Sequence, residues 1–325
     1  MNEYKSRRTS NKNTHKLIRI HLFGLMTGVC LVKFQINDVV GRKSYNCDIL
    51  FRIMTFKTIN QKTVAVLIGE DYRLIADSPL EDLQIIDETQ VELMTRAVMD
   101  LEEQSLATFF EELEKQRLTN DNELLATYDD SISFFHMPGL VLHLDGDADY
   151  LEKCLQAYDR LKIPVVGIHC TEKEMVLMVK DLITEYRPSI LVITGHDAYS
   201  RSKGSKNELN AYRHSQDFIN TIIEARKVRP SLDDLIIFAG ACQSYFEALI
   251  QAGANFASSP NRINIHALDP VYVVAKISFT PFTSKIDMLT LLKSTLSGLR
   301  GIGGIETKGV LRIGMPYNKS VFFDK

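Results

Sequence analysis

Two apolar segments rich in β-branched residues constrain the fold of this chain more than any other feature of its sequence. They lie within 190–197 and 235–244, and a glycine ends each apolar run. Continuous apolar runs of this length are typical of strands that are buried on both faces of a parallel sheet. One reactive side chain follows each glycine, the imidazole of His196 in the first segment and the thiol of Cys242 in the second.

From Gly139 onward, apolar runs alternate with segments of helical periodicity. This alternation predicts an α/β fold with a mostly parallel sheet, flanked by helices and joined by right-handed crossovers. Functional groups in such folds collect beyond the carboxyl ends of the strands, so we expect His196 and Cys242 to lie close together. The predicted strands are 139–144, 164–169, 190–194, 235–239 and 255–259, and the predicted helices are 148–161, 172–186, 208–228, 244–252 and 290–296.

Two other regions precede this α/β domain, which we assign to residues 136–325. Residues 32–87 contain closely spaced apolar runs without helices, which predict a small SH3-like β-barrel. Residues 88–135 have apolar positions at spacings of three and four, which predict a helical connector with a break at 119–123. The predicted barrel strands are 34–36, 38–41, 49–53, 63–68 and 72–76.

Residues 1–31 differ from the remainder of the chain. Basic side chains lead into an apolar run, as in a signal peptide, but Arg19 and His21 interrupt that run and no small-x-small cleavage site follows. The run is also too short and too polar for a transmembrane helix. We interpret this region as a disordered leader or a mis-annotated start, with Val32 as the alternative start.

Composition excludes several classes of protein. The formal net charge of −3 over 325 residues gives no global basicity, so we expect no nucleic-acid partner, and no membrane partner either. Five cysteines at irregular spacing form no disulfide framework and no zinc motif. A reducing cytoplasm is therefore the expected compartment, and we expect no cofactor and no metal.

The thiol and the imidazole together predict nucleophilic catalysis. A cysteine becomes a strong nucleophile when a base or a positive field favours its thiolate, and His196 can serve as the base and then protonate the leaving amine. The helix predicted at 244–252 would add its amino-terminal dipole. Backbone N–H groups at Cys242 and beside Gly195 are candidates for an oxyanion hole. Asp197 is a candidate for orienting the imidazole. We expect structural roles for the other cysteines, which are Cys30, Cys47, Cys154 and Cys170.

Acidic residues suggest two further roles. His143, Asp145 and Asp147 alternate along one predicted strand, so they could share a face and either ligate a metal or recognise a basic substrate side chain. Asp269 could join them from a late loop, although a helix cap would also explain this residue.

The sequence also resembles known peptidases. His196 and Cys242 are 46 positions apart (242 − 196), a layout similar to that of caspase-like cysteine peptidases, although Asp197 stands where those peptidases have glycine. A longer resemblance, to the YabG family of sporulation-specific proteases, covers nearly the whole chain after Val32. It rests on 38–45, 73–79, 142–147, 193–197, 238–244, 257–270 and 303–309.

The resemblance implies a cysteine endopeptidase that processes spore-coat proteins, its substrates and partners, in the mother-cell cytoplasm beside the forming coat. His196 and Cys242 would be its catalytic pair and would act through an acyl-thioester. Asp145, Asp147 and Asp269 would select Lys or Arg before the cleaved bond.

Three alternatives remain open at this point. A glutaminase-like amidohydrolase would release ammonia from glutamine without cleaving protein. A non-catalytic coat-assembly module would support full coat processing with Cys242→Ala. A metal-dependent hydrolase would lose activity to chelators and survive alkylation.

Overall fold

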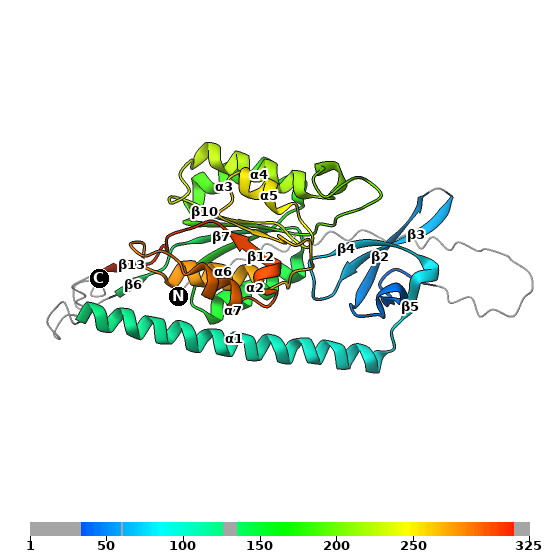
Figure 1. Ribbon diagram of the computed structural model, residues 1–325, viewed down its shortest axis with the longest axis horizontal. Coiled ribbons are helices and arrows are strands. Elements are labelled where there is room, and N and C mark those ends of the chain that lie inside the picture. The colour runs from blue at the N-terminus through cyan, green and yellow to red at the C-terminus, as the bar shows by residue number, and fades with distance from the viewer. Residues whose placement is uncertain (1–33, 60, 126–134, 315–325) are drawn as a thin grey trace, which may run out of the picture. The chain divides into compact units, whose positions relative to one another are not determined.

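The computed structural model describes residues 34–59, 61–125 and 135–314 (Figure 1). These residues all fall within one compact unit, Phe34–Lys325. The leader proposed for residues 1–31 lies outside the described residues, and the division into barrel, connector and α/β domain stays a prediction.

A six-stranded sheet forms the centre of the carboxyl-terminal region. Its strand order is β12-β11-β10-β9-β7-β8, and every pairing is parallel except that of β11 with β12. The prediction of an α/β fold with a mostly parallel sheet is therefore confirmed. The strands are β7 (Val141–Asp145), β8 (Val165–His169), β9 (Ile190–Thr194), β10 (Ile236–Ala239), β11 (Phe256–Ser258) and β12 (Ile302–Gly304).

Helices cover both faces of this sheet (Figure 1). On one face lie α3 (Glu172–Tyr186), α4 (Ser215–Val228) and α5 (Phe246–Gln251), and on the other lie α2 (Ala148–Arg160), α6 (Asp269–Phe279), α7 (Met288–Ser294) and the short α8 (Gly298–Gly301). Side-chain caps define where three of them begin: Asp147 caps α2, a capping box of Thr171 and Glu174 starts α3, and Asp287 caps α7. Each face of the sheet has its own hydrophobic cluster.

Helix α6 replaces the loop that we expected around Asp269. Most of its residues are buried, from Asp269 through Ser278, so its sequence lacks the polar face that marks an amphipathic helix.

The amino-terminal strands form a separate antiparallel sheet of order β4-β3-β2-β1-β5. Within the described residues, the edge strands β4 and β5 do not pair, so closure into an SH3-like barrel is not shown. The predicted strand at 72–76 begins only at Ile75, and residues 72–74 instead make isolated bridges to the carboxyl-terminal region. The strands are β1 (Val39–Arg42), β2 (Phe51–Ile59), β3 (Lys62–Gly69), β4 (Ile75–Pro79) and β5 (Leu83–Ile85).

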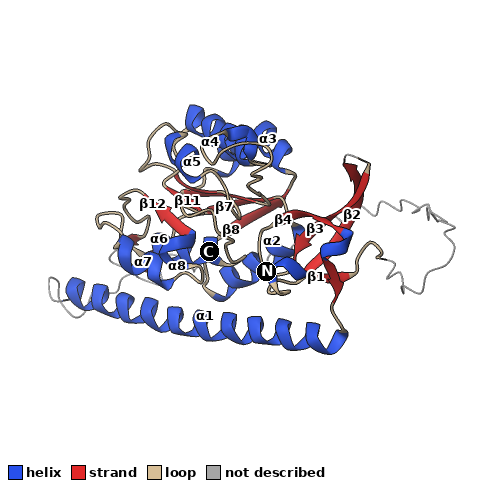
Figure 2. Ribbon diagram, turned by 45° about the vertical axis from the view of Figure 1, so that its right-hand side comes forward, coloured by secondary structure: helices blue, strands red, loops and turns tan. Residues whose placement is uncertain are grey.

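One long helix, α1 (Glu88–Leu125), forms the connector (Figure 2). The predicted break at 119–123 is wrong, because the helix continues through it and Thr119 Oγ1 donates to the Lys115 carbonyl one turn earlier, at 3.0 Å. The Phe109 ring packs edge-on against Tyr272 of α6, with 4.8 Å between centroids. None of the helices among the described residues is long and apolar enough to span a bilayer.

Candidate active site

The strand register places the imidazole and the thiol at equivalent positions. Ile193 of β9 pairs with Ala239 of β10, and His196 and Cys242 each lie three residues further along their own chains. The strand order also reverses at β7, which lies between β8 and β9. Ligands of open α/β sheets bind at such a switch point, beyond the carboxyl ends of the strands.

The thiol of Cys242 is fully buried and engaged with main-chain groups. Its Sγ accepts a hydrogen bond from the Ile265 N–H at 3.2 Å and donates to the Ile265 carbonyl at 3.6 Å. The N–H of Cys242 donates to the Arg73 carbonyl at 3.2 Å. Burial raises the pKa of the Cys242 thiol well above its usual range, so this structure holds a neutral thiol.

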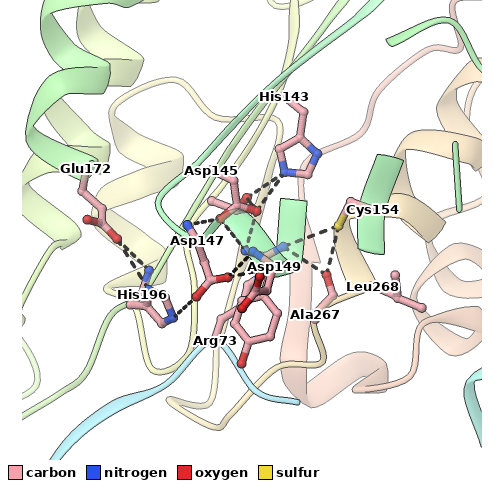
Figure 3. A network of polar contacts seen from close by, with 12 residues as sticks. Arg73, His143, Asp145, Asp147, Asp149, Cys154, Glu172, His196, Ala267 and Leu268 are labelled. Carbon is pink, nitrogen blue, oxygen red and sulfur yellow. Dashed lines mark hydrogen bonds and ion pairs between the residues drawn. The ribbon is translucent and has the colours of Figure 1, made fainter. Parts of the chain in front are cut away.

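Two carboxylates lie beside the imidazole of His196 (Figure 3). Its Nε2 is 3.3 Å from Asp147 Oδ2, and its Nδ1 is 4.0 Å from Glu172 Oε1. The backbone N–H of His196 donates to the same Glu172 oxygen at 2.9 Å. The ring of Tyr150 packs against the imidazole, with 5.7 Å between centroids. The histidine is therefore buried and held from several sides.

Two glycines make room for the Glu172 carboxylate. A Cβ at Gly146 would lie 2.3 Å from Glu172 Oε1, and a Cβ at Gly195 would lie 2.4 Å from the same oxygen. The carboxylate therefore fits between the ends of β7 and β9 only because both positions lack side chains. Sequence analysis missed Glu172, which it treated only as the start of a helix. A glycine directly after each of these two strands was the one signal that could have pointed to it.

The structure does not join the two predicted catalytic side chains. Within the described residues, no hydrogen bond links the imidazole of His196 to the thiol of Cys242. Each side chain instead has its own partners, which are carboxylates for the imidazole and the Ile265 main chain for the thiol.

Asp197, the predicted orienting residue, points away from the imidazole toward neighbouring loops. Its Oδ1 accepts the backbone N–H groups of Ala198, Arg213 and His214, at 2.8, 3.0 and 2.8 Å. Its Oδ2 accepts the hydroxyls of Ser215 and Ser244. Burial raises the pKa of this carboxyl group despite these hydrogen bonds. Asp197 thus connects the loops after β9 and β10 to the start of α4.

Asp145 forms a fully buried ion pair with Arg73 of the amino-terminal region (Figure 3). Arg73 Nη1 lies 2.8 and 2.7 Å from the two carboxylate oxygens, and Thr194 Oγ1 donates to Oδ2 at 2.9 Å. Burial alone would raise the pKa of Asp145, but the positive charge of Arg73 outweighs burial and holds this pKa far below its usual range. The predicted acceptor of a basic side chain is thus already occupied.

The neighbouring His143 is neutral. Burial lowers its pKa, and its Nε2 lies 2.8 Å from Thr194 Oγ1. Because Thr194 donates its hydroxyl proton to Asp145, Nε2 of His143 must be the donor in this contact. Within the described ranges, no group of three or more His, Cys, Asp or Glu side chains is arranged to hold a metal ion.

Asp269, the remaining predicted acidic residue, is the first residue of α6 and is fully buried. Its oxygens accept the N–H of His266 at 3.1 Å and the N–H of Ser297 at 3.2 Å. Burial raises the pKa of Asp269. This carboxyl group therefore serves the main chain in the described structure, as a helix-terminal residue does.

A cleft of about 300 Å³ lies between the amino-terminal sheet and the loops after β9 and β10. Leu74 of the amino-terminal region and Gln243, next to Cys242, both line it, but His196 and Cys242 do not. The other lining residues include Arg42, Asp48, Asp77, Tyr199, Lys203, Arg213 and Asn264. The side chains of His196 and Cys242 therefore do not line this cleft.

Comparisons with known proteins show that this chain is a peptidase and identify its family. The family described as YabG peptidase U57 matches residues 35–316, so the chain is a peptidase. The chain belongs to the YabG peptidase family. It is 51% identical over 290 residues to the sporulation-specific protease YabG of Bacillus subtilis (strain 168), covering 89% of this chain and 100% of that protein. No solved structure matches the chain.

The resemblance noted in the sequence is therefore confirmed, and this chain is a sporulation protease.

Proposed function

We propose that this chain is a cysteine endopeptidase of spore formation that processes spore-coat proteins through an acyl-thioester on Cys242. The observation that carries the proposal is the register of β9 and β10, which sets His196 and Cys242 at equivalent positions on adjacent parallel strands. A base and a nucleophile at adjacent strand ends can serve one substrate that lies across both.

Each residue has a stated role in the proposed reaction. His196 takes the proton of Cys242, and Sγ attacks the carbonyl carbon of the substrate. The peptide bond breaks, and His196 returns the proton to the leaving amine. Water then hydrolyses the thioester with His196 as the base. Asp147 is the proposed positioning residue, because its Oδ2 lies 3.3 Å from Nε2 of the imidazole.

Asp197 supports this site indirectly in the proposal. Its carboxylate connects the loop that carries His196 to Ser215 and Ser244, so it holds the two strand ends in a fixed relation. The N–H of Cys242 is the proposed oxyanion donor. Gly195 contributes by leaving space for Glu172.

Substrate selection is proposed to favour a basic residue before the cleaved bond. The candidates are Asp145, Asp147 and Asp269, all near the strand ends and each at least partly buried. Asp145 already binds a guanidinium group, that of Arg73, with oxygen distances suited to a charge-assisted pair. Coat proteins in the mother-cell cytoplasm are the proposed substrates, in keeping with the sporulation protease to which this chain is similar.

Cleavage of an unstructured protein substrate by wild type, Cys242→Ala and His196→Ala tests the mechanism. Removal of either member of a nucleophile–base pair should lower kcat/KM by about 10³-fold or more. A thiol alkylator should abolish the wild-type activity and change nothing further in Cys242→Ala.

Cys170→Ala is the matched control, because Cys170 is also a buried thiol at the end of a strand, after β8. It should retain activity. Full activity in both Cys242→Ala and His196→Ala would refute the mechanism, and loss of activity to a chelator alone would favour a metal-dependent hydrolase.

A further inference from the structure

The segment Tyr72–Leu74, between β3 and β4, lies at the candidate active site and is bridged there to two other parts of the chain. Leu74 forms a parallel bridge with Asp197, the residue after the catalytic histidine. Tyr72 forms an antiparallel bridge with His266, next to the residue that holds the thiol. The main chain of the segment is thus bridged on both sides, and it turns at Arg73, where the Leu74 N–H donates to the Tyr72 carbonyl at 2.6 Å.

The carbonyl of Arg73 occupies the position of a substrate carbonyl. It accepts the backbone N–H of Cys242 at 3.2 Å. In cysteine and serine peptidases, a backbone N–H at the nucleophile stabilises the oxygen of the carbonyl under attack. This N–H is therefore unable to serve a substrate while Arg73 accepts it.

The side chain of Arg73 anchors the segment in place. It is fully buried, binds Asp145 at 2.7 Å and donates to the Ala267 carbonyl at 3.2 Å (Figure 3). Its guanidinium group lies over the ring of Tyr150, at 5.1 Å from the centroid. The hydroxyl of Tyr150 in turn donates to the Tyr72 carbonyl at 2.8 Å and to the Gly69 carbonyl.

The segment also accounts for the closed state of the site. Cys242 is 0% exposed and His196 is 4% exposed, and Leu74 of the segment lines the neighbouring cleft. A peptide in that cleft reaches the thiol only if the segment moves. The thiol itself is hydrogen-bonded to the Ile265 main chain in this state.

We propose that Tyr72–Leu74 is an internal inhibitor that fills the peptide site of this protease, with Arg73 in the place of the substrate residue before the cleaved bond. This inference rests on the proposed function, because it assigns that same site a resting state. Activity then requires withdrawal of the segment from between Asp197 and His266, and a substrate that binds there competes with the chain's own strand.

The variant Tyr150→Phe tests this inference, because it removes the hydroxyl that holds the Tyr72 carbonyl and keeps the ring. Loss of this hydrogen bond should raise the rate of Cys242 alkylation by iodoacetamide about fivefold, and kcat/KM for an external peptide by a similar factor. The matched control is Tyr158→Phe, a buried tyrosine of the same helix whose hydroxyl lies 3.4 Å from His143 and has no partner in the segment. It should change neither rate.

Peptide mass spectrometry reads each thiol separately, so Cys170 serves as an internal reference for general loosening of the fold. A rise at Cys242 without a rise at Cys170 supports the inference. Equal rises at both thiols, or no rise at Cys242 in a folded Tyr150→Phe protein, would overturn it.

A synthetic peptide of residues 70–77 provides a second test that needs no folded variant. It should raise the apparent KM of the wild-type protease for the external peptide without changing kcat, and the same peptide with alanine in place of its arginine should inhibit at least tenfold less. Absence of inhibition, or equal inhibition by both peptides, would overturn the inference. If Cys242→Ala cleaves as well as wild type, the proposed function fails, but alkylation still reports whether the segment covers this thiol.

Discussion

The two reactive side chains lie at equivalent strand ends but in opposite surroundings. The His196 end is organised by charge, with Asp147 and Glu172 beside the imidazole and Asp145 paired to Arg73 nearby. The Cys242 end is organised by the main chain, because the thiol binds the N–H and carbonyl of Ile265 and the Cys242 N–H binds the Arg73 carbonyl. If His196 and Cys242 act as we propose, the base already has carboxylates beside it, whereas the nucleophile is held as a buried, neutral thiol.

The largest expected effect concerns the buried ion pair at the charged end. Arg73→Ala leaves the Asp145 carboxylate buried without its cation and should lower the free energy of unfolding by about 3–5 kcal/mol. Cys242→Ala at the uncharged end should cost only about 1 kcal/mol, the typical cost of a point substitution. Urea unfolding of both variants measures the difference, and similar losses would show that the two ends do not differ as described.

Lowering the pH should reduce the free energy of unfolding mainly through Asp145, at the His196 end. The pKa of Asp145 is held far below its unfolded value of about 3.9, so its contribution to stability is fully present above about pH 4 and is lost as pH falls below that value. Burial raises the pKa of Asp197. Protonation of this group therefore favours the folded state, which is the opposite of the effect of protonating Asp145. Urea unfolding between pH 6 and pH 3 measures the balance.

Asp145→Asn is the matched variant for this measurement, since it removes the titrating group. Its stability should fall less steeply with acid than that of wild type. An identical slope in the two proteins would contradict the assignment of the acid loss to the ion pair.

Removing the carboxylate beside His196 should have a smaller effect, and this effect should be on activity alone. Asp147→Asn keeps the cap of α2, because asparagine also caps helices, but removes the charge beside His196. We expect kcat/KM to fall about a hundredfold with little change in the free energy of unfolding. Asp149→Asn, an exposed position in the same turn, should leave both unchanged. Equal kcat/KM in Asp147→Asn and wild type would show that Asp147 does not orient the imidazole.

The smallest effect concerns the uncharged end at alkaline pH. Because burial raises the pKa of Cys242, its alkylation rate should still increase between pH 9 and pH 10, where the rate of free cysteine levels off. Mass spectrometry of the alkylated peptide follows this rate. A plateau near pH 8.5 would indicate a thiol in ordinary solvent and would remove the contrast between the two ends.

The main sheet could be predicted from the sequence because its strands are continuous apolar runs. Each run is long enough to be recognised alone, and helices with polar faces separate the runs. Helix α6 could not be predicted in the same way, since it is buried along most of its length and lacks a polar stripe. The helix through 119–123 was missed because polar residues there suggested a turn, although they also occur in exposed helices.

The sequence allowed us to predict which residues follow single strands, but not which distant residues contact them. The equivalent positions of His196 and Cys242 could be predicted because each residue follows an apolar run and a glycine, whereas their catalytic role stays a proposal. The partners of these residues come from distant segments: Arg73 is 72 positions before Asp145, and Glu172 is 24 positions before His196. Spacing along one strand grouped Asp145 with Asp147, but folding gives them different partners, the buried guanidinium group of Arg73 and the imidazole of His196.

The short strands β6 (Phe135–Met137) and β13 (Arg312–Gly314) pair antiparallel where the chain enters and leaves the α/β region. The two ends of this region, which we call the cassette, are therefore hydrogen-bonded to each other. This pairing should limit fraying at both ends of the region, while the Arg73–Asp145 pair connects the region to the amino-terminal part of the same compact unit. The amino-terminal sheet, which supplies Arg73, is then the part that makes the cassette a regulated peptidase in our proposal.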